Sequence, residues 1–324
     1  MKKLQFIFAA AALLVLSLGM TGCDPNDPNN PNNPDMPAIV STSETNNNGI
    51  IVEAIYKNNI RLYFRLTGPN TCSFSYYYYF YNSPGFEQYD YSGDLVIPET
   101  LTHKGVTYTV TCIGDLGKST KVTSISIPKT IENLSRENAS GQEYAPFIRE
   151  NSLASLKAFN VATDNPYITS IDGVLFSKDK TRLLAYPKGK AGEVYSIPEG
   201  TNAFGGGWSG EEYYYGGYFS AFEGHFQFSS LIVPNSVTEL NMWAFLNCHS
   251  LRTITLPSTM RALGYQPFYG CDSLTSMTCL ASVPPIKVDT AKIAEKLDTV
   301  RVAASSVAAY KAAAGWKDLT IVAL

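Results

Sequence analysis

Residues 229–248 read SSLIVPNSVTELNMWAFLNC, and residues 250–271 read SLRTITLPSTMRALGYQPFYGC. The two segments repeat one pattern, because each apolar landmark of the first recurs 23 residues later in the second. The matched landmarks are Val233 and Leu256, Leu240 and Leu263, Phe245 and Phe268, and Cys248 and Cys271. A fixed period in this range predicts a solenoid, in which each unit buries its apolar side only by stacking on its neighbours.

The same phase extends beyond this stretch, with insertions. Ile97-Pro98, Ile127-Pro128 and Ile197-Pro198 open earlier units. We therefore predict a leucine-rich repeat solenoid over residues 93–280, mainly β with short turns and helical pieces. Each unit carries the L-x-x-L-x-L-like strand signature of leucine-rich repeats, as Val122/Ile125/Ile127, Leu156/Phe159/Val161, Phe228/Leu231/Val233, Leu251/Ile254/Leu256 and Leu274/Met277/Cys279.

Strand alternation predicts which side chains of these units face outward, on the concave side of the solenoid. They are small and mostly neutral, namely Ser124, Ser126, Ala158, Asn160, Ser230, Ile232, Thr253, Thr255, Ser276 and Thr278. Hydroxyl pairs on neighbouring strands stabilise a sheet by about 0.2–1 kcal/mol each, so this ladder has a structural explanation. It lacks the Trp, Tyr and Arg anchors that dominate protein interfaces.

The N-terminus predicts an export signal and a tether. Two lysines precede an apolar run from Leu4 to Leu18, which indicates a signal peptide over residues 1–22. The ending Met20-Thr21-Gly22-Cys23 resembles a bacterial lipobox, which implies acylation of Cys23; an ordinary signal peptide followed by an unrelated cysteine is the alternative. Residues 23–38 are rich in Pro and Asn and predict a disordered, solvated tether. We expect a lipid anchor in the bacterial envelope, at the outer membrane or cell surface, as the only membrane contact.

Residues 39–92 predict a β cap for the N-terminal end of the array, since a terminal repeat has an open apolar side. Ile60, Leu62, Phe64 and Leu66 alternate with Arg61, Tyr63, Arg65 and Thr67, so we expect a half-buried strand. The run Tyr76–Tyr81 belongs either to this cap or to an aromatic platform for a sugar or a partner protein.

Residues 281–324 predict a closing α/β cap. Thr290–Leu297 combines a capping-type threonine with helix-favouring residues, and Thr299–Ala303 predicts a strand. We also expect Ser305 or Ser306 to cap a helix over residues 307–314 that ends at Gly315.

One insertion carries the large aromatic side chains that the ladder lacks. Residues 205–218 read GGGWSGEEYYYGGY. Loops on a rigid scaffold often carry binding residues, and Trp and Tyr combine a large apolar ring with a polar tip. In the alternative interpretation these rings fold back over the flank of the solenoid. The candidate ligand-binding residues are Trp208, Tyr213, Tyr214, Tyr215 and Tyr218.

The residue composition disfavours catalysis, metal binding and nucleic-acid binding. No group of residues supplies a nucleophile, a base and an orienting group together, so we expect no enzymatic activity and no cofactor. Three histidines and a net charge of −3 disfavour a multi-histidine metal site and a nucleic-acid partner. His225, Cys248 and Cys271 share one phase of the repeat. The two cysteines could be small core residues, a disulfide, or zinc ligands together with His225.

These repeats resemble those of BspA-type leucine-rich repeat proteins of bacterial surfaces, with the pattern IPxxVxxIxxxAFxxCxxLxxIxIP. The resemblance covers about residues 91–324, including a hairpin repeat at 165–201, but residues 133–151 form an insertion without repeat phase. It implies a non-catalytic surface lipoprotein that adheres to host extracellular-matrix or bacterial surface proteins. A glycan-binding accessory lipoprotein that uses the aromatic loops, and a structural envelope protein, are the alternatives.

Overall fold

The computed structural model describes residues 41–45, 49–55, 61–74, 92–114, 121–132, 134, 136–137, 143–144, 153–204, 221–222, 227–287 and 292–324. Within these ranges the only helical elements are η1 (Ala304–Ser306) and α1 (Val307–Ala312), and strands make up most of the remaining regular structure. The prediction of a mostly β repeat fold is therefore confirmed. The signal peptide, the tether, the run Tyr76–Tyr81 and the insertion at 205–218 lie outside the described residues.

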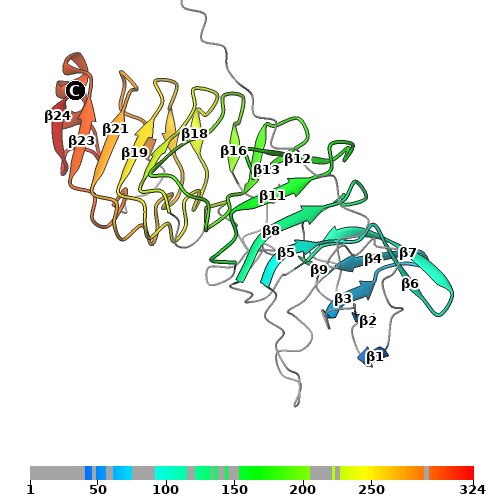
Figure 1. Cartoon of the computed structure of the whole chain (residues 1–324). Helices are drawn as coiled ribbons and strands as arrows, with labels where there is room; N and C mark the ends of the chain where they lie inside the picture. The colour runs from blue at the N-terminus through cyan, green and yellow to red at the C-terminus, as the bar shows by residue number, and fades with distance from the viewer. Residues whose placement is uncertain are drawn as a thin grey trace, which may run out of the picture.

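The N-terminal sheet has six strands in the order β1-β2-β3-β4-β7-β6, and all neighbours are antiparallel except β4 and β7. Its last two strands come after residue 93, so this sheet also includes chain from the start of the expected array. Figure 1 shows the sheet at the opposite end of the molecule from β24. The strands are β1 (Ser41–Thr45), β2 (Gly49–Ile55), β3 (Arg61–Leu66), β4 (Thr71–Phe74), β6 (Thr100–His103) and β7 (Val106–Ile113).

Strand β3 lies within the range expected to be a half-buried strand, but it does not keep the expected alternation at Tyr63. Tyr63 in β3 is 2% exposed, and its neighbours Leu62 and Phe64 are also buried. The Tyr63 hydroxyl donates a hydrogen bond to Glu53 Oε1 on β2 at 3.0 Å. A tyrosine can be buried in this way because its one polar atom finds a partner while the ring behaves as an apolar surface.

Parallel strands stacked side by side form one long face of the array, in two groups (Figure 1). The first has the order β11-β8-β5 and the second the order β15-β17-β19-β21-β23-β24. In the second, Ser230 lies beside Thr253, Thr253 beside Ser276, and Ser276 beside Thr299. The strands are β5 (Ser92–Val96), β8 (Lys121–Ile127), β11 (Ala158–Val161), β15 (Val194–Ser196), β17 (Ser230–Ile232), β19 (Thr253–Leu256), β21 (Ser276–Cys279), β23 (Thr299–Val302) and β24 (Thr320–Ala323).

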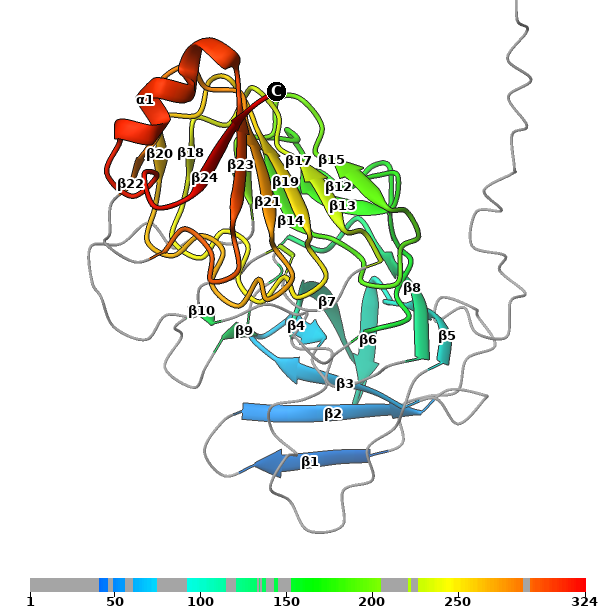
Figure 2. The same cartoon turned by 90° about the vertical axis from the view of Figure 1, so that its left-hand side faces the viewer.

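A second, shorter row of parallel strands forms another side of the same coils, as the end-on view in Figure 2 shows. It contains β18 (Glu239–Leu240), β20 (Ala262–Leu263) and β22 (Ile286–Lys287). Leu240 lies beside Leu263 across β18 and β20, which is the pairing expected from the sequence pattern. In the insertion at 133–151, the described residues form a small antiparallel pair, β9 (Arg136–Glu137) and β10 (Glu143–Tyr144).

The hairpin repeat joins two hydrophobic cores. Its sheet has the order β12-β13-β14-β16, formed by β12 (Ile168–Ile171), β13 (Val174–Ser177), β14 (Arg182–Ala185) and β16 (Ala203–Phe204). In β13, Val174 and Phe176 belong to the core that extends to the C-terminal end, whereas Leu175 belongs to the core shared with the N-terminal sheet. Because β13 is buried on both faces, it links the two halves of the molecule.

The turn between β12 and β13 depends on glycine. Asp172 and Gly173 have φ values of 50° and 76°, and positive φ at both central residues is typical of the tight hairpin turns that favour Asp-Gly. Gly173 also packs against β11, where an added Cβ would lie 2.9 Å from Ala158 Cβ. Its carbonyl accepts a hydrogen bond from the Phe159 amide at 2.9 Å, so the turn also attaches the hairpin to the preceding coil.

The C-terminal segment confirms two expected elements and corrects two details. Strand β23 and helix α1 lie where a strand and a helix were predicted, although α1 ends at Ala312. Of the two serines that could cap the helix, Ser306 occupies the N-cap position of α1, but it is buried and makes no side-chain cap bond. Over Lys292–Leu297 the structure has bends and a turn in place of the expected helix, because Ile293, Ala294 and Leu297 are all drawn into the core of the array.

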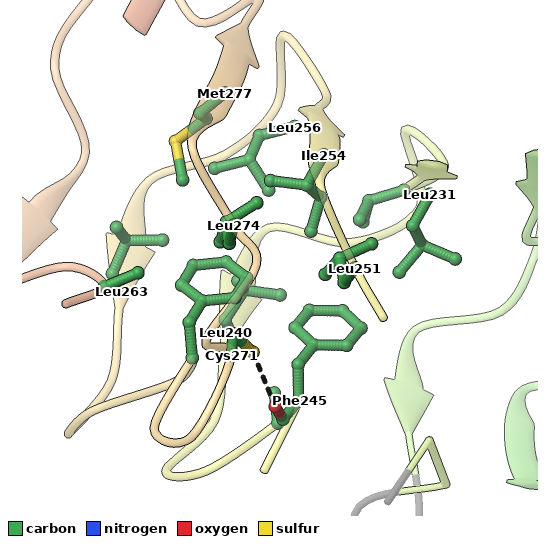
Figure 3. Packing of buried hydrophobic residues seen from close by; sticks show 14 of the residues in the cluster. Leu231, Leu240, Phe245, Leu251, Ile254, Leu256, Leu263, Cys271, Leu274 and Met277 are labelled. Carbon is green, nitrogen blue, oxygen red and sulfur yellow. Dashed lines mark hydrogen bonds between the residues drawn. The ribbon is translucent and has the colours of Figure 1, made fainter. Parts of the chain in front are cut away.

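A column of phenylalanine rings runs through the coils. Phe245 lies 5.7 Å from Phe222 and 5.4 Å from Phe268 between ring centroids, and it stacks on Phe268 at an interplanar angle of 5°. Figure 3 shows Phe245 packed among the leucines of neighbouring coils. Offset and stacked aromatic pairs add about 0.5–1.5 kcal/mol beyond the burial of their surface.

Asn165 fixes the entry into the hairpin repeat, and it is fully buried. Its side-chain amide donates to the carbonyls of Pro128 and Ile131 at 2.9 and 3.0 Å. Its side-chain oxygen accepts from the amides of Tyr167 and Ile168 at 2.8 and 2.9 Å. One side chain therefore satisfies four backbone groups from two coils.

We expect Asn165→Ala to lower the free energy of unfolding by about 3 kcal/mol, because it leaves several buried backbone groups without partners. Asn160→Ala is the matched control, since Asn160 is exposed on β11 and should change stability by less than about 0.5 kcal/mol. Chemical denaturation followed by circular dichroism measures both. Equal midpoints for the two variants would contradict the role assigned to Asn165.

Candidate interaction surface

The long face of the array presents the ladder predicted from the sequence. The predicted outward residues are exposed or half-buried, whereas the residues between them, such as Leu231, Ile254 and Met277, are buried. The ladder continues onto β23, where Arg301 Nη1 donates to Ser276 Oγ at 2.5 Å. The face from β17 to β23 is therefore largely neutral, with one cation near its C-terminal end.

Two apolar side chains interrupt the ladder of hydroxyls. Val194 on β15 is 57% exposed, and Ile232 on β17 is 39% exposed. Val194 lies beside Ser230, and Ile232 lies beside both Ser196 and Thr255. The two residues give the N-terminal end of this sheet a more apolar surface than its centre.

The predicted binding residues of the insertion, Trp208 to Tyr218, lie outside the described residues. The nearest described residues on either side of the insertion, Phe204 and Ala221, pack in the core. The Phe204 ring lies 6.4 Å from Phe222 and 5.7 Å from Phe245. The Ala221 carbonyl accepts a hydrogen bond from the Tyr186 amide at 3.0 Å. The described chain on both sides of the insertion is therefore held in the core, with Phe204 next to the column of phenylalanines.

The cysteines in the shared repeat phase bond to the backbone of the preceding coil. Cys248 Sγ donates to the Phe222 carbonyl at 2.7 Å, and Cys271 Sγ donates to the Phe245 carbonyl at 3.1 Å (Figure 3). Both cysteines are buried, and no disulfide forms among the cysteines that the structure describes. This geometry favours the interpretation as small core residues. His225 lies outside the described part of the chain.

Sequence reasoning missed one exposed aromatic surface, which we name the tyrosine flank: Met242, Leu246, Tyr265 and Tyr269. Tyr265 and Tyr269 are 44% and 57% exposed. Met242 and Leu246 occupy the same positions one coil earlier and are half-buried, outside the core cluster. The signal was present in the repeat, because the residue 23 positions before each tyrosine is an apolar residue that is only half-buried.

The backbone under the tyrosine flank is tightly connected. The amides of Trp243 and Asn247 donate to the carbonyls of Tyr265 and Tyr269 at 3.1 and 2.8 Å. Gly264 allows the two coils to approach, since an added Cβ would lie 2.6 Å from the Leu240 carbonyl oxygen. These contacts fix the spacing of the coils from which the four side chains project.

Comparison with known proteins agrees with this geometry. The family model described as BspA type Leucine rich repeat region matches residues 218–309, with six copies. Residues 218–309 form a BspA-type leucine-rich repeat region. The tyrosine flank, the two buried cysteines and strands β17 to β23 all lie within it.

Solved structures similar to this chain include bacterial leucine-rich repeat proteins. A leucine-rich repeat protein from Eubacterium ventriosum is 15% identical, with a TM-score of 0.42, over 81% of this chain and 82% of its own. A leucine rich cell surface protein from Faecalibacterium prausnitzii is 16% identical, with a TM-score of 0.33, over 88% and 95%. The pneumococcal vaccine antigen PcpA is 14% identical, with a TM-score of 0.29, over 89% and 100%. No curated protein matches the chain.

The described residues hold no group of three or more His, Cys, Asp or Glu side chains placed to bind a metal ion. Among the helices of the described ranges, none is long and apolar enough to cross a membrane. The buried ionisable side chains of the described residues include tyrosine hydroxyls and cysteine thiols, together with Lys188.

Burial changes the ionisation of several of these groups. It raises the pKa of Tyr186 to about 12, with a further contribution from the Asp172 carboxylate. It raises the pKa of the Cys72 thiol to about 12 as well. The pKa of Tyr310 is also raised by burial and then by its hydrogen bond to Cys279 Sγ, which is 3.1 Å long. All three groups stay protonated at neutral pH.

We expect the stability of the fold to decrease as the pH rises from about 9 to about 12. In this window the unfolded chain loses protons from Cys and Tyr, whereas the folded chain keeps them, so alkali favours unfolding. The thermal midpoint of the unaltered protein should fall as the pH rises across this range. The midpoint of the Tyr186→Phe variant should fall less steeply, because this variant lacks one of the titrating groups. Tyr167→Phe, a change at an exposed tyrosine, serves as the control. A midpoint that does not depend on pH would rule out this coupling.

Proposed function

We propose that the protein is a surface-displayed lipoprotein whose repeat array binds a protein partner, either in the host extracellular matrix or on a bacterial surface. The observation that carries the proposal is the continuous core from Val174 to Ile321, which holds the outward-facing side chains of successive coils on one scaffold. Repeats of this kind create extended binding surfaces. The outward residues offer hydroxyls, aromatic rings and the Arg301 guanidinium, which are groups suited to recognising a partner.

The proposed cellular location is based on the N-terminal sequence. Acylation of Cys23 would anchor the chain, and the Pro- and Asn-rich segment that follows would act as its spacer. The N-terminal sheet would then lie nearest the membrane, and the end that carries β24 would lie farthest away (Figure 1). We propose further that the N-terminal sheet and the segment after residue 281 cap the two ends of the array.

We assign the partner contact to the aromatic insertion, through Trp208, Tyr213, Tyr214, Tyr215 and Tyr218. Large aromatic residues are the anchors most often found at protein hot spots, and the ladder between β17 and β21 lacks them. The packed ends of the insertion, Phe204 and Ala221, support this assignment because they couple it to a rigid column.

We expect Cys23→Ser to release the protein from the membrane fraction, since one replaced sulfur removes the acylation site. Fractionation of cells and metabolic labelling with a fatty-acid analogue measure the effect. Cys279→Ser is the control that leaves the lipobox intact. If the Cys23 variant stayed in the membrane fraction, the proposed lipid anchor would be contradicted. If the protein on intact cells were protected from added protease, the proposed display on the cell surface would be contradicted.

We expect Trp208→Ala combined with Tyr214→Ala to weaken binding to immobilised extracellular-matrix proteins at least about tenfold, as loss of hot-spot aromatics does. The control Tyr167→Ala removes an exposed tyrosine from the hairpin repeat and should bind like the unaltered chain. A glycan array probed with the same variants tests the saccharide alternative. If the unaltered chain bound a saccharide but no matrix protein, and both changes abolished the saccharide binding, the proposed protein partner would be wrong and the glycan alternative would be supported.

A further inference from the structure

The hairpin repeat stands as a partition between two hydrophobic cores. Successive residues of a strand point to opposite faces of its sheet. Val174 and Phe176 enter the core of the C-terminal coils, whereas Leu175 enters the core shared with the N-terminal sheet. The parallel strands of the long face are divided at the same place, since no ladder joins β11 to β15 in the described part of the chain. The core and the long face are therefore both interrupted at the hairpin repeat.

The hairpin repeat is firmly attached to the coils that follow it. Strand ladders continue the array on this side, because β14 pairs with β16 and β15 pairs with β17. The ring of Tyr186 also packs against Phe222 and Phe228, at 5.7 and 5.0 Å between ring centroids. The hairpin repeat therefore belongs structurally to the C-terminal coils.

The attachment to the preceding coil is different, because β11 forms no ladder with any described strand of the hairpin repeat. Apart from the chain connection at Asn165, two backbone hydrogen bonds between described residues cross this boundary. The Phe159 amide donates to the Gly173 carbonyl at 2.9 Å, and the Gly189 amide donates to the Leu156 carbonyl at 2.7 Å. The side of the partition that faces β11 is thus held by isolated bonds.

The two surfaces at this boundary meet closely at glycines. An added Cβ on Gly189 would lie 2.7 Å from the Ser155 carbonyl carbon and 2.9 Å from the Ala154 carbonyl oxygen. An added Cβ on Gly173 would lie 2.9 Å from Ala158 Cβ. The boundary is therefore closed by the approach of two backbones, and it can separate without breaking a strand ladder.

We propose that the boundary between β11 and the hairpin repeat is a joint, which opens while the chain on both sides stays folded. The stability of stacked repeats is a sum of terms between neighbours, so an interface without a ladder opens before interfaces that have one. Asn165 is the pivot, because its side chain holds the connecting chain to the carbonyls of Pro128 and Ile131. An open joint changes the direction in which the BspA-type repeats are presented without unfolding them. This proposal is independent of the partner proposed for the aromatic insertion.

Native-state hydrogen exchange tests the joint, measured by NMR on the full chain carrying Cys23→Ser, which removes the acylation site. Gly189 and Gly264 are matched probes, since each amide donates a 2.7 Å bond to a carbonyl of an earlier coil. We expect the amides of Phe159 and Gly189 to exchange at least about tenfold faster than the Gly264 amide. Low concentrations of denaturant should accelerate both boundary amides equally, because one opening exposes them together.

Two glycine variants provide a second, matched test. Gly189→Ala places a methyl group against backbone at the joint, whereas Gly264→Ala places one 2.6 Å from the Leu240 carbonyl oxygen, within the C-terminal coils. Gly189→Ala should speed exchange of the Phe159 amide about tenfold further and leave the Val233 amide, which bonds to the next coil, unchanged. Gly264→Ala should affect Val233 and leave Phe159 unchanged. Circular dichroism establishes that each variant is folded.

Three results would overturn the joint, and the first two need no glycine variant. In the first, Phe159 and Gly189 exchange no faster than Gly264, so that the boundary opens only when the whole array unfolds. In the second, denaturant does not accelerate the two boundary amides, so that their exchange reflects local fluctuation that exposes no new surface. In the third, Phe159 responds equally to both glycine variants, so that the array opens as a single unit.

Discussion

The structure depends on the stacking of apolar side chains between successive coils. No coil has enough apolar surface to form a core by itself, so Phe222, Phe245 and Phe268 are buried only because their neighbours are in register. The register is set jointly by the parallel ladder and by thiols such as Cys271, which bond to the preceding coil. Removing one large ring from such a column costs about 3–5 kcal/mol, because the coils on both sides hold the cavity open.

This constraint also decides which residues are available for function. Strand alternation places Thr253 and Thr255 outside whenever Ile254 is inside, so the long face is selected partly for strand pairing. The turn at residues 265–270 also has exposed positions, since Pro267 and Phe268 are buried whereas Tyr265 and Tyr269 are exposed. The exposed side chains of Tyr265 and Tyr269 lie outside the core that sets the register, so the surface can differ between coils that share one architecture.

The sequence predicts the part of the fold that repeats. The spacing of Leu231, Ile254 and Met277 shows period and phase directly, and their burial and pairing follow. It does not predict Asn165, because a single buried amide that bridges two coils leaves no periodic trace. The expected helix over residues 290–297 failed for a related reason. Local helix preference is weak, and burial of Ile293 and Leu297 in the array prevails over it.

The two segments that interrupt the 23-residue period, the hairpin repeat and the aromatic insertion, have different effects because they are inserted at different points of the coil. The hairpin repeat enters as paired strands and is buried on both faces of β13, so it connects two cores and leaves little room for change. The aromatic insertion enters between Phe204 and Ala221, where the chain leaves the column and returns to it. An insertion at this point can lengthen without altering the stacking of Phe222 on Phe245. An inserted segment can therefore vary in sequence where only the residues that flank it are packed in the core. It cannot vary freely where the inserted residues themselves form part of the core.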